Sequence, residues 1–141
     1  MGKINWGRVI LGGLAAGVVI NLSEWALNEL VLKEQWVEAM KALGKTGEMT
    51  ATNIVVWNIW GFLAGIGAVW VYAAIRPRFG PGAGTAVKAG LAVWFFAHLL
   101  WALGSWNMGL FPQNPILTGA AWSLVETILA ALVGGWVYKE A

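Results

Sequence analysis

The side chains in this sequence that could carry out chemistry are few and lie within long apolar stretches. Glu24, Glu126 and His98 could hold or transfer protons, and Asn21 and Asn58 could hydrogen-bond to them. A charged side chain at the centre of a bilayer costs about 2.5 to 3.5 kcal/mol on insertion scales, so each should face other helices. We therefore predict that these five residues form one intramembrane polar cluster.

Three interpretations of this cluster are open. In the first, the polar groups only hydrogen-bond across helices, which contributes ~0.6 to 2 kcal/mol and fixes the packing register. In the second, two carboxylates and an imidazole line a path for protons or cations. In the third, Glu24, His98 and Glu126 bind a metal, but no two of these ligands share a helix at a spacing of three or four residues. We predict no catalytic residue, no metal and no cofactor.

Within the cluster, Glu24 and Glu126 are expected to share one interior site. Each lies on a helical face of small residues, and such faces are the ones that pack against other helices. Burial in a low dielectric disfavours the charged form of a carboxyl group, so Glu24 is expected to be mostly protonated when it has no partner.

The elements that must position these residues are membrane-spanning helices. Hydrophobic residues make up 59% of the 141-residue chain and charged residues only 11%, against about 25% charged in soluble domains. A hydrocarbon core about 30 Å thick needs roughly 20 apolar residues per helix. We predict an all-α polytopic membrane protein whose residues 1–141 form one antiparallel four-helix transmembrane domain, with spans at about 9–32, 52–75, 85–103 and 116–138.

The connections between the spans differ in character. In the first loop, apolar residues recur at helical spacing among charged ones (Trp36, Val37, Met40 and Leu43), which predicts a short amphipathic helix lying at the interface. The stretch 105–119 carries no charge and contains Pro112 and Pro115, so we predict a semi-buried loop there.

Small residues recur on one face of three spans, at spacings that bring helices close together. The predicted packing residues are Gly13, Gly17, Gly61, Gly65, Ala130 and Gly134. Because glycine lets backbones approach closely, these residues predict helix contacts within one protomer or between protomers.

Charge sets the expected location and orientation. Six of the nine Lys and Arg residues lie on the side of the chain termini: Lys3, Arg8, Arg76, Arg78, Lys88 and Lys139. The positive-inside rule then predicts a multi-pass membrane protein with both termini cytoplasmic. No basic run with interleaved aromatic residues indicates nucleic acid, and the chain has no cysteine for disulfides or thiolate metal sites.

Short repeats raise the possibility of two tandem helix hairpins. The triplet Trp-Val-Tyr occurs at 70–72 and again at 136–138, and Gly-Leu-Ala occurs at 13–15 and at 90–92. Triplets of common residues also coincide by chance in so biased a composition, so both a duplication and coincidence stay open.

The layout resembles a known type of bacterial protein. Asn5-Trp6 precedes a Gly- and Ala-rich first span, and a loop with the run from Trp36 to Gly44 precedes three more spans. This order is similar to a family of small four-span bacterial inner-membrane proteins labelled as a domain of unknown function. The resemblance implies location and layout, and it brings no activity or catalytic residue.

The sequence as a whole predicts a protein that is not an enzyme. We expect a binding or assembly subunit that packs in the lipid bilayer with itself, as a homo-oligomer, or with a membrane-protein partner. The alternative is a small proton- or ion-coupled transporter or channel that uses Glu24, His98 and Glu126.

Overall fold

A computed structural model describes residues 3–139, and every element in this part of the chain is helical. The predicted all-α fold class is therefore confirmed. In chain order the elements are α1 (Trp6–Trp25), the π-helix η1 (Ala26–Val31), α2 (Lys33–Ala42), α3 (Ala51–Phe79), α4 (Ala83–Val93), the π-helix η2 (Trp94–Leu99), α5 (Leu100–Met108) and α6 (Gln113–Val137).

Four helical segments are long and apolar enough to cross a membrane. They are Trp6–Val31, Ala51–Phe79, Ala83–Met108 and Gln113–Val137, so α1 continues through η1, and α4 continues through η2 into α5. Within a bilayer the helix satisfies every backbone hydrogen bond internally, which is why apolar stretches of this length fold as helices. The amphipathic helix predicted in the first loop is α2, whose charged residues are exposed while Ala39 is buried.

The prediction of a loop over 105–119 was wrong. The third span ends at Met108 instead of 103, α6 begins at Gln113, and only residues 109–112 are not helical. Gly109 ends α5 in a left-handed conformation at φ 64°. Pro115 belongs to the first turn of α6, where a missing N–H costs nothing because those N–H groups have no partner in the helix.

The second span also extends further than its predicted end at residue 75. Helix α3 runs to Phe79 and includes Pro77. Because Pro77 lies in the last turn, its missing N–H removes a single hydrogen bond there, and the helix stops at Gly80 with φ 82°.

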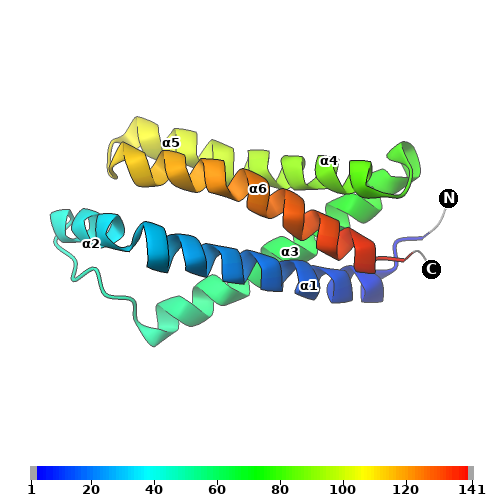
Figure 1. Cartoon of the computed structure of the whole chain (residues 1–141), viewed down its shortest axis with the longest axis horizontal. Coiled ribbons are helices and arrows are strands. Elements are labelled where there is room, and N and C mark those ends of the chain that lie inside the picture. The colour runs from blue at the N-terminus through cyan, green and yellow to red at the C-terminus, as the bar shows by residue number, and fades with distance from the viewer. Residues whose placement is uncertain (1–2, 140–141) are drawn as a thin grey trace.

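The helices form two pairs, α1 with α3 and α4 with α6, and the two pairs pack against each other. Helix α1 packs chiefly against α3 and α6, α4 packs against α6 and α3, and α3 also contacts α6. Figure 1 shows both ends of the chain at one end of the bundle, with α2 and the connection from α5 to α6 at the other. We call the half of the bundle that holds the chain ends the terminal half, and the half that holds α2 the distal half.

The terminal half contains the main core cluster. Its fully or nearly fully buried residues are alanines, β-branched residues and two tyrosines: Val9, Ala16, Ile20, Val69, Tyr72, Ala73, Ala86, Ala89, Ala130, Ala131 and Tyr138. The predicted packing glycines lie here or at its edge. A Cβ on Gly17 would lie 2.8 Å from Cα of Phe62, and a Cβ on Gly65 would lie 2.5 Å from N of Gly17, so neither position has room for a side chain.

The second helix pair meets in the same way. A Cβ on Gly90 would lie 2.7 Å from Cα of Ile128, and a Cβ on Gly134 would lie 2.9 Å from the carbonyl oxygen of Gly12. Glycine thus sets the distance between α4 and α6 and between α6 and α1, as it does between α1 and α3.

The two tyrosines of the repeated Trp-Val-Tyr triplet have equivalent roles in the structure. Their rings meet edge to face, with centroids 5.9 Å apart. The Tyr138 hydroxyl accepts a hydrogen bond from N–H of Asn5, the N-cap of α1, and the Tyr72 hydroxyl accepts one from N–H of Gly82, the N-cap of α4. Each helix pair therefore supports the start of the other, as two tandem hairpins related by an approximate twofold axis would.

Candidate functional site

The two carboxylates predicted to share an interior site lie next to each other in the structure. Glu24 is in the last turn of α1, directly before η1, and Glu126 is about 20 Å from the start of α6 at 1.5 Å per residue. Glu126 is 2% exposed, and Glu24 is its principal charged neighbour. We call these two residues the carboxyl pair.

Glu24 has a hydrogen-bond partner on its own helix. The side-chain amide of Asn28 donates to Oε2 of Glu24 at 2.8 Å and to the Glu24 carbonyl oxygen at 2.9 Å. Asn28 belongs to η1, in which Leu32 N–H reaches the carbonyl of Leu27. Short π-helical segments occur often at functional sites, and here η1 begins two residues after Glu24.

Glu126 accepts no hydrogen bond of good geometry among residues 3–139, although the side chains of Ser23 and Glu24 lie close to its carboxyl group. Both of its carboxylate oxygens are buried, and neither receives a well-formed hydrogen bond. The neighbouring hydroxyls on α6 serve their own helix, since Ser123 donates to the carbonyl of Ala120 and Thr127 donates to that of Ser123. A buried polar group without a partner is uncommon in folded proteins and calls for a physical explanation.

A hydrogen bond beside the carboxyl pair joins α1 to α6. Nε1 of Trp122 donates to Oγ of Ser23 at 2.8 Å, and Ser23 lies close to Glu126. Because the Ser23 hydroxyl accepts from the indole, its own proton remains available to a nearby carboxylate.

The other members of the predicted cluster lie at two further contacts. Asn21 contacts Gly61, and its amide donates to the carbonyl oxygen of Asn58 at 3.1 Å, which joins α1 to α3. The Asn58 amide donates to the carbonyl of Ile54 in the preceding turn. His98 on η2 meets the ring of Trp60 edge to face, with centroids 5.8 Å apart.

The third interpretation required three ligands around one metal ion. Within residues 3–139, no group of three or more acidic, histidine or cysteine side chains is placed to hold a metal. The structure gathers the predicted polar residues into a carboxyl pair, an asparagine contact and a His–Trp contact.

Sequence reasoning singled out neither Ser23 nor Trp122 for the site. Trp122 lies about 14 Å from the start of α6 at 1.5 Å per residue, which is well inside the span. Its position four residues before Glu126, on the same helical face, is the signal that could have assigned it to the site.

Comparison of the chain with family models, with curated proteins and with solved structures finds no match. The functional argument therefore rests on the residues and their geometry.

Proposed function

We propose that this chain is a multi-pass protein of the bacterial inner membrane that acts by binding and assembly within the bilayer and is not an enzyme. The observation that carries the proposal is the exposure of the first ten residues of α3. Every residue from Ala51 to Trp60 is exposed, although the rest of α3 contributes six buried residues. In Figure 1 this part of α3 diverges from α1 toward the distal end.

The chemistry of this exposed segment, about 15 Å long, favours a protein neighbour over lipid alone. Its apolar side chains, including Trp57 at 58% exposed, suit either environment. Asn58 does not, because an amide in hydrocarbon is unfavourable whereas between helices it forms hydrogen bonds. We propose that a second copy of the chain, or a membrane-protein partner, covers this segment.

Asn58 also provides the test. The bond from Asn21 uses only the backbone carbonyl of Asn58, so Asn58→Leu leaves that contact between α1 and α3 in place. We expect wild type to be oligomeric in lipid nanodiscs and Asn58→Leu to weaken the oligomer about threefold to twentyfold, as the loss of ~0.6 to 1.7 kcal/mol implies. Val125→Leu, at an exposed position of α6 outside this segment, is the control and should leave the association unchanged. A monomeric wild type would refute the proposal.

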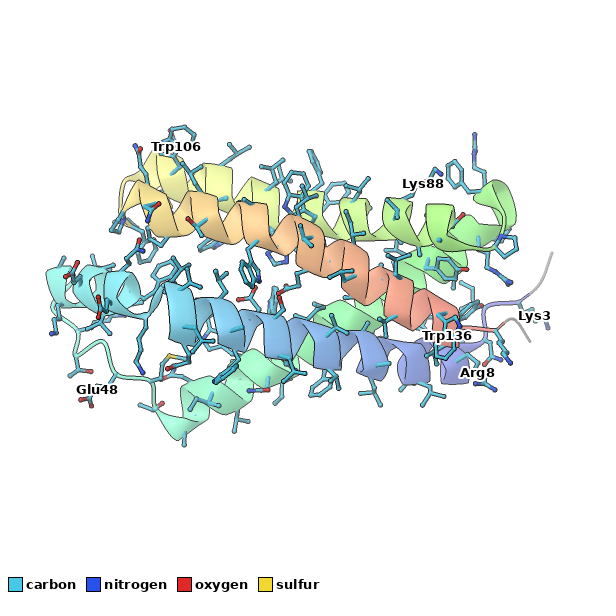
Figure 2. The ribbon with its side chains drawn as sticks, in the orientation of Figure 1. Lys3, Arg8, Glu48, Lys88, Trp106 and Trp136 are labelled. Atoms are coloured by element: carbon cyan, nitrogen blue, oxygen red, sulfur yellow. The ribbon has the colours of Figure 1, made fainter. Side chains whose placement is uncertain are left out.

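The proposed orientation places both termini in the cytoplasm. Figure 2 shows Lys3, Arg8 and Lys88 at the end of the bundle that holds the termini, and Glu48 at the opposite end. This asymmetry follows the positive-inside rule. Since the chain has no cysteine, single cysteines at exposed Lys45 and exposed Ala83 can report orientation. An impermeant thiol reagent should label intact cells at position 45 only, and labelling at position 83 alone would reverse the orientation.

A small proton- or ion-coupled transporter is the second candidate, and the burial of the carboxyl pair favours it. Under this alternative, Glu24→Gln or Glu126→Gln should abolish flux in proteoliposomes while the purified oligomer stays intact. Under the assembly proposal, removal of a polar side chain lowers folding or association, and no flux is present to lose.

A further inference from the structure

The carboxyl pair has no cation to balance it within the described part of the chain. The single salt bridge there joins Lys33 to Glu29 at the distal surface. No hydrogen bond or ion pair joins Glu24 or Glu126 to Lys, Arg or His.

The charged and titratable groups on every element packed against the pair lie elsewhere. Those on α1, α3 and α4 are Arg8, Tyr72, Arg76, Arg78 and Lys88, which belong to the terminal halves of their helices. Those on η1 and α2 are Glu29, Lys33, Glu34, Glu38 and Lys41 at the distal end. On η2, which also packs against α6, His98 meets the ring of Trp60.

Two neighbouring carboxyl groups that are buried and have no cation beside them cannot both be ionised. A like charge close by and removal from water both disfavour the second negative charge, so at least one proton stays with the pair. An undissociated acid next to a carboxylate can also donate a hydrogen bond to it, which gives the buried oxygens of Glu126 the interaction that they otherwise lack.

The hydrogen bonds decide which residue carries the proton. Glu24 accepts a bond from the Asn28 amide at 2.8 Å, and a donor of this kind favours the ionised form of a carboxyl group. Glu126 has only the Ser23 hydroxyl nearby as a donor and receives no well-formed bond from it, so its neutral acid form fits its surroundings better. The sequence alone predicted a protonated Glu24 only when its partner is absent; with both residues present, this geometry favours the proton on Glu126.

We propose that Glu24 and Glu126 form a proton-binding site inside the membrane, in which the carboxylic acid of Glu126 donates to the carboxylate of Glu24. The inference goes beyond assembly and does not depend on whether the chain self-associates.

The same geometry argues against a metal cation as the ligand. A hard cation replaces its hydration shell with about six or more oxygen ligands, whereas a proton needs only two. Around the pair, no third acidic, histidine or cysteine ligand joins it among residues 3–139.

Infrared spectroscopy of the full chain in vesicles of phosphatidylethanolamine and phosphatidylglycerol tests the proposal. At neutral pH we expect the C=O stretch of an undissociated carboxyl group, with a downshift in D2O. The band should disappear in Glu126→Gln and persist in Glu24→Gln. Glu34→Gln is the control, because Glu34 is exposed on α2 and its loss should leave the band unchanged. Absence of the band from wild type, or its survival in folded Glu126→Gln, would overturn the proposal.

A labelling experiment on the wild-type chain needs no variant. A hydrophobic carbodiimide reacts with undissociated carboxyl groups in apolar surroundings, so peptide mass spectrometry should find the adduct at Glu126. Labelling should fall as the pH is raised and should be the same in sodium, potassium and choline chloride. Protection by sodium or potassium at constant pH would assign the site to a metal cation and would overturn the proposal, as would labelling at Glu24 alone.

Discussion

The terminal and distal halves of this bundle hold their helices together in different ways. In the terminal half, α1, α3 and α6 meet backbone to backbone over glycine and alanine. In the distal half, side chains make the contacts: Leu27, Leu32 and Ile116 are buried there, and hydrogen bonds join Trp122 to Ser23 and Asn114 to Gln35. Close packing of two backbones depends on all of its contacts together, whereas contacts between single side chains can be changed one at a time.

This difference suggests that the two halves have different roles. The terminal half fixes the crossing of the helices, because its backbones touch at glycine. The distal half contains the carboxyl pair at its inner boundary, both π-helical segments and the exposed start of α3. Regions with few packing contacts are those from which proteins draw their moving and binding parts.

The largest effect that would test this comparison is expected from Gly65→Leu. A side chain at Gly65 would meet the backbone of Gly13 and Gly17, so α1 and α3 would have to separate. Overpacking of this kind typically costs 1 to 3 kcal/mol or more, and here it involves backbone that cannot yield. We expect failure to fold, seen as aggregation or proteolysis of the expressed chain.

Gly67 offers a matched control two residues along the same helix. A Cβ there meets no atom within 4 Å, so Gly67→Leu should fold as wild type does. Equal thermal stability of the two variants would show that the glycine contacts of the terminal half do not hold the bundle.

An intermediate effect is expected at the boundary between the halves. Glu24→Ala removes one of the two acceptors of the Asn28 side chain and leaves Glu126 without its neighbour, whereas Glu24→Gln keeps the shape and a carbonyl acceptor. Leaving buried polar groups unsatisfied costs about 1 to 3 kcal/mol. Thermal unfolding in lipid should show a lower midpoint for Glu24→Ala and little change for Glu24→Gln; the opposite ranking would indicate that the charge of Glu24 stabilises the fold.

The smallest effects are expected from variants that each remove one hydrogen bond, two in the terminal half and one in the distal half. Tyr72→Phe and Tyr138→Phe each remove one acceptor from an N-cap N–H in the terminal half, and each should cost about 0.5 to 1.5 kcal/mol. Trp122→Phe removes the bond to Ser23 in the distal half and should cost about 0.6 kcal/mol, the average for such bonds in membranes. Unfolding free energies measured under one set of conditions would rank them. A clearly unequal effect of the two tyrosines would argue against equivalent hairpins.

Much of the fold could be predicted from local pattern alone. Apolar stretches of more than 18 residues must form helices in a bilayer, because no other partner satisfies their backbone groups, and the faces carrying Gly13, Gly17 and Ala130 follow from helical periodicity. Helix ends were less predictable. Pro112 and Pro115 indicate a loop by composition, yet the first turn of α6 accommodates Pro115 because that turn has N–H groups without partners.

The sequence by itself therefore determined the helices, their apolar length and the small-residue faces along them, since these depend on residues close together in the chain. Only the tertiary structure decided which polar residues meet. Whether Glu24 faces Glu126 or His98 depends on the crossing and rotation of α1, α6 and η2, which backbone contacts at distant glycines such as Gly90 and Gly134 set. One helical residue turns a side chain by about 100°, so a small change in those contacts would pair different groups.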